Sequence, residues 1–509
     1  MENPLQIYIK PEIFDHLIYP ISLKLDDEKI VSLFRKLHIL SEIDFKIPFK
    51  EWLKNSTELG LNKTEAAILF QTFKIYESEP DIPQIITKSR YESNNTNSKN
   101  SVDVRYFGLF FALQSFSQRT KVSLIIDNKT EKNPNFFASP LSSPRGKTGG
   151  HRLGMQGMQG MEYQFILNFI RSNLKLFLRI VASDIHNTET TISANEFNTL
   201  KFLFTTEDKK HSNKKNTPLA NYLHCFDNLP PITKINMNII NEFLLSALSG
   251  APPELSNYVV IKGLSKCVTI KSGNEYQNKS LLITNCDDTY IYINTNVSNC
   301  KISFCTNCTI VVAVASKIIS IDKCDKCNIC IVSNFTRISN IIDSNIYLFS
   351  VNEPVLYGDN RGLKLGPHNV TYNDLYVHIK ESRLPISQNS YKNFSSPVYL
   401  SNNNKDHVYI IKPEEFITIV VPFEAKDPFN YIFTPKTYLE IIQKRYNNYL
   451  NIQKMIKDAG FQESQEKAFH IALQGNFKDW LVNSGNFKPL NDLVKMIDEP
   501  YGLGPLTSK

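Results

Sequence analysis

The stretch from about Lys279 to Phe349 repeats itself every 19 residues, and this repeat constrains the fold more than any other feature of the chain. Five columns of residues keep one register over three successive units: Leu281, Cys300 and Ile319; Ile283, Ile302 and Ile321; Cys286, Cys305 and Cys324; Ile291, Ile310 and Ile329; Ile293, Val312 and Ile331. Stacked parallel strands require such a pattern, because each coil buries its inward face only against the coils beside it. The repeat predicts a short parallel β-helix, with the alternating strands of a β-sandwich as the alternative.

The corner of each predicted coil carries cysteines. Cys305 with Cys308, and Cys324 with Cys327, form two Cys-x-x-Cys pairs at the spacing of a four-cysteine zinc site. Both pairs also follow from the 19-residue period, and cysteine is a small, weakly polar side chain that packs readily in an apolar interior. We therefore predict that these four cysteines are structural and bind no metal, with zinc as the alternative.

The composition predicts a multidomain protein of ordinary soluble type, since 42% of its 509 residues are hydrophobic and 21% are charged. A net charge of +7 without a basic cluster predicts no nucleic-acid partner. The most apolar stretch is interrupted by Arg171, Lys175 and Arg179, so we expect no membrane insertion. The start of the chain lacks the pattern of a signal peptide, which predicts a cytoplasmic location with reduced cysteines.

Sequence motifs offer neither a cofactor site nor a catalytic site. Gly146-Lys147-Thr148 resembles the end of a phosphate-binding loop, but Leu141 stands where that loop needs a glycine. The chain shows no Ser-His-Asp, HExxH or paired-carboxylate pattern. We therefore predict no cofactor.

Three regions follow from these patterns. Residues 1–252 are predicted to be mostly helical, with flexible insertions near 93–101 and 128–161 that are polar and low in complexity. Residues 253–394 form the β-helix domain, and 395–509 form a C-terminal region of one or two strands and helices. The fold class is therefore multidomain α+β.

Helix signals support this division. An acidic start at Asp26 and a capping-box pattern at Ser193 and Glu196 each precede apolar residues at helical spacing. Near the C-terminus, an amphipathic helix is expected over Lys436 to Gly460, and a second over Ser464 to about Ile497. We expect these two helices to pack on the β-helix, with a docking surface for a partner helix or a cytoskeletal filament as the alternative.

Four segments carry a resemblance to a known family: the coils from about Ser280, VVAVASKIISIDKCDKCNICI, NIYLFSVNEPVLYGDNRGLKLGPHNVTY, and FKDWLVNSG around Trp480. They resemble the tubulin-binding cofactor C domain family. More narrowly, they resemble a branch of it that combines a helical N-terminal region, this domain and a helical tail. The resemblance implies a right-handed parallel β-helix of the C-CAP/cofactor C-like type.

The resemblance also bears on catalysis. Tubulin cofactor C and its retinitis pigmentosa relative activate GTPases by presenting an arginine that follows a glutamine pair on one coil, and such an arginine is worth on the order of 10³ to 10⁵ in rate. Matching that motif places Ser320 at the arginine position, and Lys317 and Ile318 at the glutamine positions. Lysine lacks the planar fork of arginine that grips a phosphate. The resemblance thus implies that the catalytic features are lost.

Two other arginines are candidates for a displaced finger. Arg337 lies about one coil after Ser320, and Arg361 lies in the loop DNRGLKLG. Neither carries the surrounding motif, and we expect each to be a solvated surface arginine.

The branch implies a non-catalytic adaptor of the cytoskeleton at the centrosome, the microtubule-organising centre and the spindle pole, with roles in centrosome and Golgi positioning and in cell morphogenesis. Its expected partners are centrosomal or microtubule-associated proteins, including tubulin or an Arf-like GTPase bound without activation. The alternative is a GTPase-activating protein or a tubulin-folding cofactor that acts on tubulin or an Arf-like GTPase.

Overall fold

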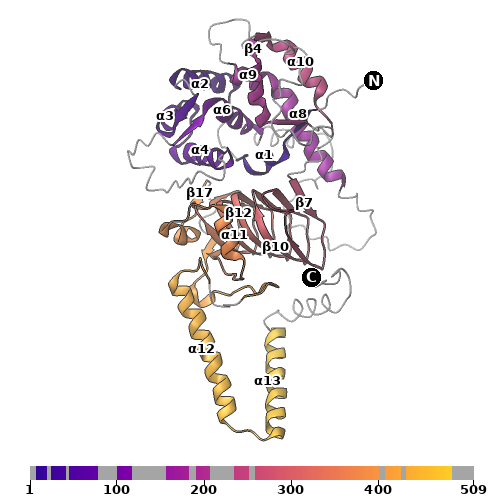
Figure 1. Cartoon of the computed structure of the whole chain (residues 1–509), viewed down its shortest axis with the longest axis vertical. Helices are drawn as coiled ribbons and strands as arrows, with labels where there is room; N and C mark the ends of the chain where they lie inside the picture. Colours follow the sequence, from indigo (N-terminus) through magenta and orange to yellow (C-terminus); the bar gives the residue numbers. More distant parts are fainter. Residues whose placement is uncertain are drawn as a thin grey trace.

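The computed structural model has a helical N-terminal region on one side of a β-helix and two long helices that project from the opposite side (Figure 1). It describes residues 7–19, 25–41, 45–77, 100–116, 156–182, 191–206, 234–250, 258–400, 407–425 and 431–483.

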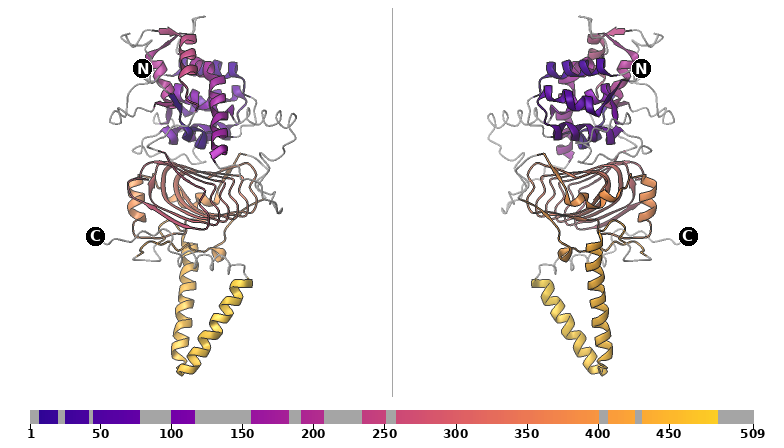
Figure 2. Two further views of the ribbon diagram at one scale, coloured as in Figure 1. Left: turned by 90° about the vertical axis from the view of Figure 1, so that its right-hand side faces the viewer. Right: turned by 90° about the vertical axis from the view of Figure 1, so that its left-hand side faces the viewer.

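The β-helix is a single sheet of twelve strands in which the paired strands run parallel, and its coils stack as nested arcs (Figure 2). Its strands are β7 (Tyr258–Lys262), β8 (Val268–Ser272), β9 (Ser280–Thr284), β10 (Tyr290–Val297), β11 (Cys300–Ser303), β12 (Thr309–Asp322), β13 (Asn328–Ser339), β14 (Asn345–Ser350), β15 (Val355–Tyr357), β16 (Leu363–Pro367), β17 (Val398–Tyr399) and β18 (Val408–Ile410). The predicted parallel β-helix is therefore confirmed, and the β-sandwich alternative is wrong.

The strand register reproduces the 19-residue columns. Ile302 pairs with Ile283 on one side and with Ile321 on the other. Ile310 likewise lies between Ile291 and Ile329. These isoleucines are fully buried or nearly so, because the inward face of each coil is closed by the next coil.

The corners repeat in their backbone as well as in their sequence. Asp288, Asn307 and Lys326 each adopt the left-handed conformation, with φ of 52°, 53° and 52°. Left-handed residues return at Lys266 and Asp343, which lie 22 residues before and 17 residues after this series. The stack thus extends beyond the three coils that share the 19-residue period, with coils of other lengths at both ends.

The cysteines lie in one column at this corner. Cys286, Cys305 and Cys324 are each at most 1% exposed. The N–H of Thr306 donates to the C=O of Cys286, and the N–H of Asp325 donates to the C=O of Cys305. This confirms the predicted cysteine column.

The N-terminal region is helical with short antiparallel strand pairs. Its elements are β1 (Ile7–Ile9), α1 (Pro11–His16), α2 (Asp27–Leu40), β2 (Lys46–Pro48), α3 (Phe49–Asn55), η1 (Ser56–Leu59), α4 (Lys63–Glu77), β3 (Ser101–Asp103), α6 (Val104–Leu113), α8 (Gln156–Val181), β4 (Thr191–Ser193), α9 (Ala194–Asn198), η2 (Thr199–Phe202), β5 (Phe204–Thr206), β6 (Lys234–Asn236) and α10 (Met237–Ala247). Aromatic rings fill its core: Trp52 meets Phe107 edge-on at 4.7 Å between ring centroids. The predicted helix start at Asp26 and the predicted capping box at Ser193 are both confirmed.

The predicted insertions fall largely outside the described residues, as does the Gly146-Lys147-Thr148 triplet. The ends of both insertions are exceptions, since β3 already begins at Ser101 and α8 at Gln156. None of the described helices is both long enough and apolar enough to cross a membrane.

After β16 the chain continues through α11 (Leu375–Ser382), η5 (Gln388–Ser395) and η7 (Pro413–Glu415) to α12 (Lys436–Asp458) and α13 (Glu463–Asn483). β17 and β18 extend the β-helix sheet by pairing with β15 and β16. The first turns of α12 pack on the β-helix, whereas nearly all of α13 is exposed. The expectation that both helices pack on the β-helix is therefore wrong for α13, because apolar periodicity predicts a helix but does not say what covers it.

Candidate functional site: the docking face of the β-helix

One outward column of residues runs across the coils on the side that faces the N-terminal region. In strand register, Lys301 lies beside Ser320, and Ser320 lies beside Arg337. Neighbouring strands are about 4.8 Å apart, so these three side chains form one row. Ile318, Phe335 and Val355 of the same side belong to the hydrophobic core of the N-terminal region. We call these six residues the docking face.

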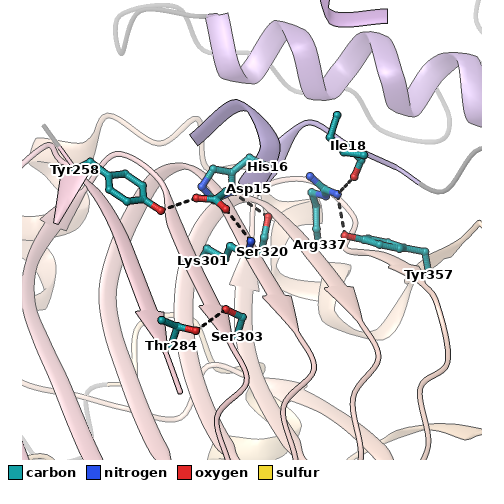
Figure 3. A network of polar contacts seen from close by, with 10 residues as sticks. All are labelled: Asp15, His16, Ile18, Tyr258, Thr284, Lys301, Ser303, Ser320, Arg337 and Tyr357. Carbon is teal, nitrogen blue, oxygen red and sulfur yellow. Dashed lines mark hydrogen bonds and ion pairs between the residues drawn. The ribbon is translucent and has the colours of Figure 1, made fainter. Parts of the chain in front are cut away.

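Ser320, at the expected arginine position, lies under helix α1. Its Oγ and the Nδ1 of His16 form a hydrogen bond of 2.9 Å (Figure 3). Ser320 is 3% exposed and His16 is 1% exposed. Burial lowers the pKa of His16 to about 3, helped by the nearby Arg337 and Lys301 charges and opposed by Asp15. His16 is therefore neutral near pH 7, and the pair is a neutral hydrogen bond.

An ion pair holds Asp15, the residue of α1 that precedes His16. The carboxylate of Asp15 accepts hydrogen bonds from Lys301 Nζ at 2.7 Å and from Tyr258 Oη at 2.6 Å (Figure 3). Burial by itself raises the pKa of Asp15, but the charge of Lys301 and the two hydrogen bonds outweigh it, so the pKa lies below its usual value. Because both side chains of the pair are mostly buried, it is screened less than a surface pair.

Arg337 is the largest polar side chain in the docking face, and it is only 1% exposed. Its Nη2 donates to the backbone oxygen of Ile18 and to Tyr357 Oη, the latter at 2.8 Å (Figure 3). Its guanidinium carbon lies 4.0 Å from the centre of the Tyr19 ring, a cation–π contact. The expectation that Arg337 is a solvated surface arginine is wrong, because the N-terminal region covers it.

The two residues at the glutamine positions also contact the N-terminal region. Lys317 Nζ donates to the backbone oxygen of Tyr76, the penultimate residue of α4, at 2.8 Å. Ile318 is fully buried. Arg361, in contrast, keeps 55% of its side chain exposed and forms an ion pair with Asp359. It lies on a corner of the β-helix, next to Ile342 of the preceding coil.

The four Cys-x-x-Cys cysteines lie apart from this face, inside the corner column. Each thiol is close to the backbone oxygen two residues before it, as in Cys308 to Thr306 at 3.2 Å and Cys327 to Asp325 at 3.3 Å. Among the described residues, no group of three or more His, Cys, Asp or Glu side chains is arranged to hold a metal ion. The structural role of these cysteines remains our proposal.

The docking face can fasten the N-terminal region, but it leaves no guanidinium open to a nucleotide. Asp15, His16, Tyr258 and Lys301 were not predicted as site residues. The repeat could have indicated the outward column, because Lys301 and Ser320 are 19 residues apart. It did not extend to Arg337, which follows Ser320 by 17 residues. No signal linked α1 to this column, because the two are separated by about 300 residues of chain.

Comparisons with known proteins agree with the resemblance. The family model "Tubulin binding cofactor C" matches residues 278–396. The sequence is 27% identical to TBCC domain-containing protein 1 of Xenopus tropicalis over 246 residues, which is 48% of this chain and 44% of the relative. The Xenopus laevis protein of that name is 28% identical over the same shares of the two chains. These two matches span less than half of the relatives' own length.

A longer match extends outside the domain. TBCC domain-containing protein 1 of Rattus norvegicus is 22% identical over 497 residues, which is 86% of this chain and 85% of the relative. Residues 278–396 are thus a tubulin binding cofactor C domain, within a chain whose homologues are named TBCC domain-containing protein 1.

Proposed function

We propose that this protein is a non-catalytic cytoskeletal adaptor that acts at the centrosome and the spindle pole, in centrosome and Golgi positioning and in microtubule organisation. The observation that carries the non-catalytic part is the setting of Ser320, a neutral side chain buried beneath α1. Without a finger, about 4 to 7 kcal/mol of transition-state stabilisation is missing, so a bound GTPase would hydrolyse GTP at its intrinsic rate.

The proposed partners are centrosomal or microtubule-associated proteins, including tubulin or an Arf-like GTPase held without activation. The docking face supports this proposal, because the N-terminal region occupies the side of the β-helix on which resembling activators present their arginine. A partner would therefore bind elsewhere on the molecule.

The test is single-turnover GTP hydrolysis by tubulin and by an Arf-like GTPase, with and without the full chain. We expect no acceleration, while tubulin cofactor C with its arginine serves as the positive control. A fluorescent fusion should accumulate at the centrosome and the spindle poles. Strong stimulation by the unmodified chain, or a fusion spread evenly through the cell, would refute the corresponding part of the proposal.

One observation favours a second candidate, a GTPase-activating protein with Arg337 as a displaced finger. Arg337 lies directly beside Ser320 in strand register, one strand away from the expected position. It would reach a nucleotide only after the N-terminal region had left the docking face, since Ile18 and Tyr19 now contact its guanidinium.

A charge reversal separates the two candidates. Asp15→Lys places a second positive charge against Lys301 and should loosen the docking face. Glu28→Lys is the matched control, because it breaks an exposed ion pair with Arg179 inside the N-terminal region. GTP hydrolysis that accelerates with Asp15→Lys alone, and returns to the intrinsic rate when Arg337→Lys is added, would favour the activator. No acceleration in any variant favours the adaptor.

A further inference from the structure

The helices α12 and α13 leave the β-helix as an open hairpin. The base of α12 is fixed to the body, with Tyr438 Oη donating to the backbone oxygen of Ile411 at 2.7 Å and Arg445 Nη1 to that of Phe416 at 2.6 Å. Beyond this point the two helices are joined by the short turn between Asp458 and Glu463, and they diverge from this turn (Figures 1 and 2). The hairpin therefore exposes faces that are ordinarily covered in a folded protein.

Both arms carry apolar side chains in the open. On α12, Tyr449, Ile452 and Met455 are 53%, 56% and 71% exposed. On α13, Leu473, Phe477 and Trp480 are 51%, 53% and 55% exposed. Contiguous exposed apolar surface of this kind marks interaction sites, and helices in proteins take most of their stability from packing an apolar face.

The apolar residues follow the spacing of a helix-packing seam. Beyond the base of α12, where Ile442 packs against the β-helix core, Tyr446, Tyr449 and Ile456 follow one another by steps of three and seven. On α13, Leu473, Phe477 and Trp480 are separated by steps of four and three. Such steps place side chains along one stripe that interdigitates with the stripe of a neighbouring helix. Each arm thus presents a seam of this kind for another helix, and Met455 and Ile471 are exposed apolar side chains outside these seams.

The charges of the two arms are complementary. α12 carries five basic residues against two acidic ones, whereas α13 carries three acidic residues against two basic ones. Near the turn, Lys454 and Lys457 end α12, and Glu463 and Glu466 begin α13. An α12 seam therefore fits an antiparallel α13 better than a second α12, for which like charges would meet.

We propose that a second copy of this chain covers the hairpin. In this dimer α12 of each copy packs antiparallel on α13 of the other, and the two hairpins form a four-helix bundle. The arrangement is self-complementary, as a two-fold interface requires, because each copy supplies one net basic helix, α12, and one net acidic helix, α13. It uses the seams that diverge within a single copy and leaves the docking face untouched.

The first measurement is the mass of the full chain by light scattering after size exclusion, over a series of protein concentrations. We expect a particle of two chains of 58.4 kDa each. Tyr449→Glu or Phe477→Glu, which place a charge in a seam, should return the mass to one chain. Asn451→Glu is the matched control, because it adds the same charge half a turn away from the α12 seam and should leave the dimer intact.

Charge reversal then tests the pairing of α12 with α13. Lys454→Glu with Lys457→Glu should weaken the dimer, and adding Glu463→Lys with Glu466→Lys should restore it. A one-chain mass at every concentration would overturn the proposal, whether the hairpin closes on itself or binds another protein. A dimer that survives Tyr449→Glu and Phe477→Glu would overturn it as well, since the copies would then meet elsewhere.

Discussion

Replacing Arg337 with alanine tests whether this buried guanidinium fastens the N-terminal region to the β-helix. The change removes two hydrogen bonds from a charged donor, to Ile18 and to Tyr357, each worth about 1.5 to 3 kcal/mol. It also removes the cation–π contact with Tyr19, worth about 2 kcal/mol away from water. Against this, Nε and Nη1 of Arg337 are buried and have no hydrogen-bond partner among the described residues, and each such group costs about 1 to 3 kcal/mol.

The lost hydrogen bonds and cation–π contact outweigh the relief of the two nitrogens without a partner. The net destabilisation expected for Arg337→Ala is about 3 kcal/mol. The assay is chemical denaturation of the full chain, followed by hydrogen exchange of the backbone around α1. Because the interaction joins two regions, exchange should rise first in the segment 11–19 that lies on the docking face. Arg361→Ala is the control, since it breaks only an exposed ion pair and should cost less than about 1 kcal/mol.

Two results would refute this reasoning. The first is a change in stability for Arg337→Ala no larger than that of Arg361→Ala, which would mean that the buried guanidinium contributes nothing to the contact. The second is unchanged hydrogen exchange around α1 in a protein that has lost stability, which would place the effect inside the β-helix.

Three further predictions concern other parts of the molecule. Ile302→Asp should abolish the cooperative thermal transition seen by circular dichroism, because the charge would lie between two coils without water or a partner, whereas Ile302→Val should cost only about 1 kcal/mol. The pKa of His16 is lowered by burial from 6.5 to about 3, so the unfolded chain binds a proton that the folded chain does not. The stability that depends on a neutral His16 should therefore be fully present above about pH 6.5 and should be lost as the pH falls toward about 3. Denaturation of His16→Gln should show a free energy of unfolding that depends less on pH over this window. Elemental analysis should find no stoichiometric zinc, and one zinc per chain that disappears in Cys308→Ser would contradict the structural role of the cysteines.

The β-helix could be predicted because its pattern is local and repeated. Each strand alternates inward and outward residues, and a fixed period brings equivalent residues such as Ile283, Ile302 and Ile321 together in one column. The hydrophobic effect then decides which face is buried without any knowledge of distant segments. Helix starts such as Asp26 were predictable for the same reason, since a cap depends only on its immediate neighbours.

The candidate site was predictable only in part. The resemblance identified Ser320, Lys317 and Ile318, but it gave no sign that all three contact the N-terminal region. The contacts of Ser320 and Lys317 join residues 304 and 241 positions apart, and the outward face of a strand looks the same in sequence whether water or a helix covers it. Arg337 was misjudged as a surface residue on those grounds.

The sequence alone determined the parallel coils, the buried cysteine column, the helical character of both flanking regions and the absence of an arginine at position 320. Only the tertiary structure decided which surfaces meet. It placed α1 over Ser320 and enclosed Arg337 between Tyr19 and Tyr357, and it left the seams of α12 and α13 open. The physical reason is that periodicity fixes which side of an element is apolar, whereas its partner is chosen by shape and charge complementarity between segments far apart in the chain.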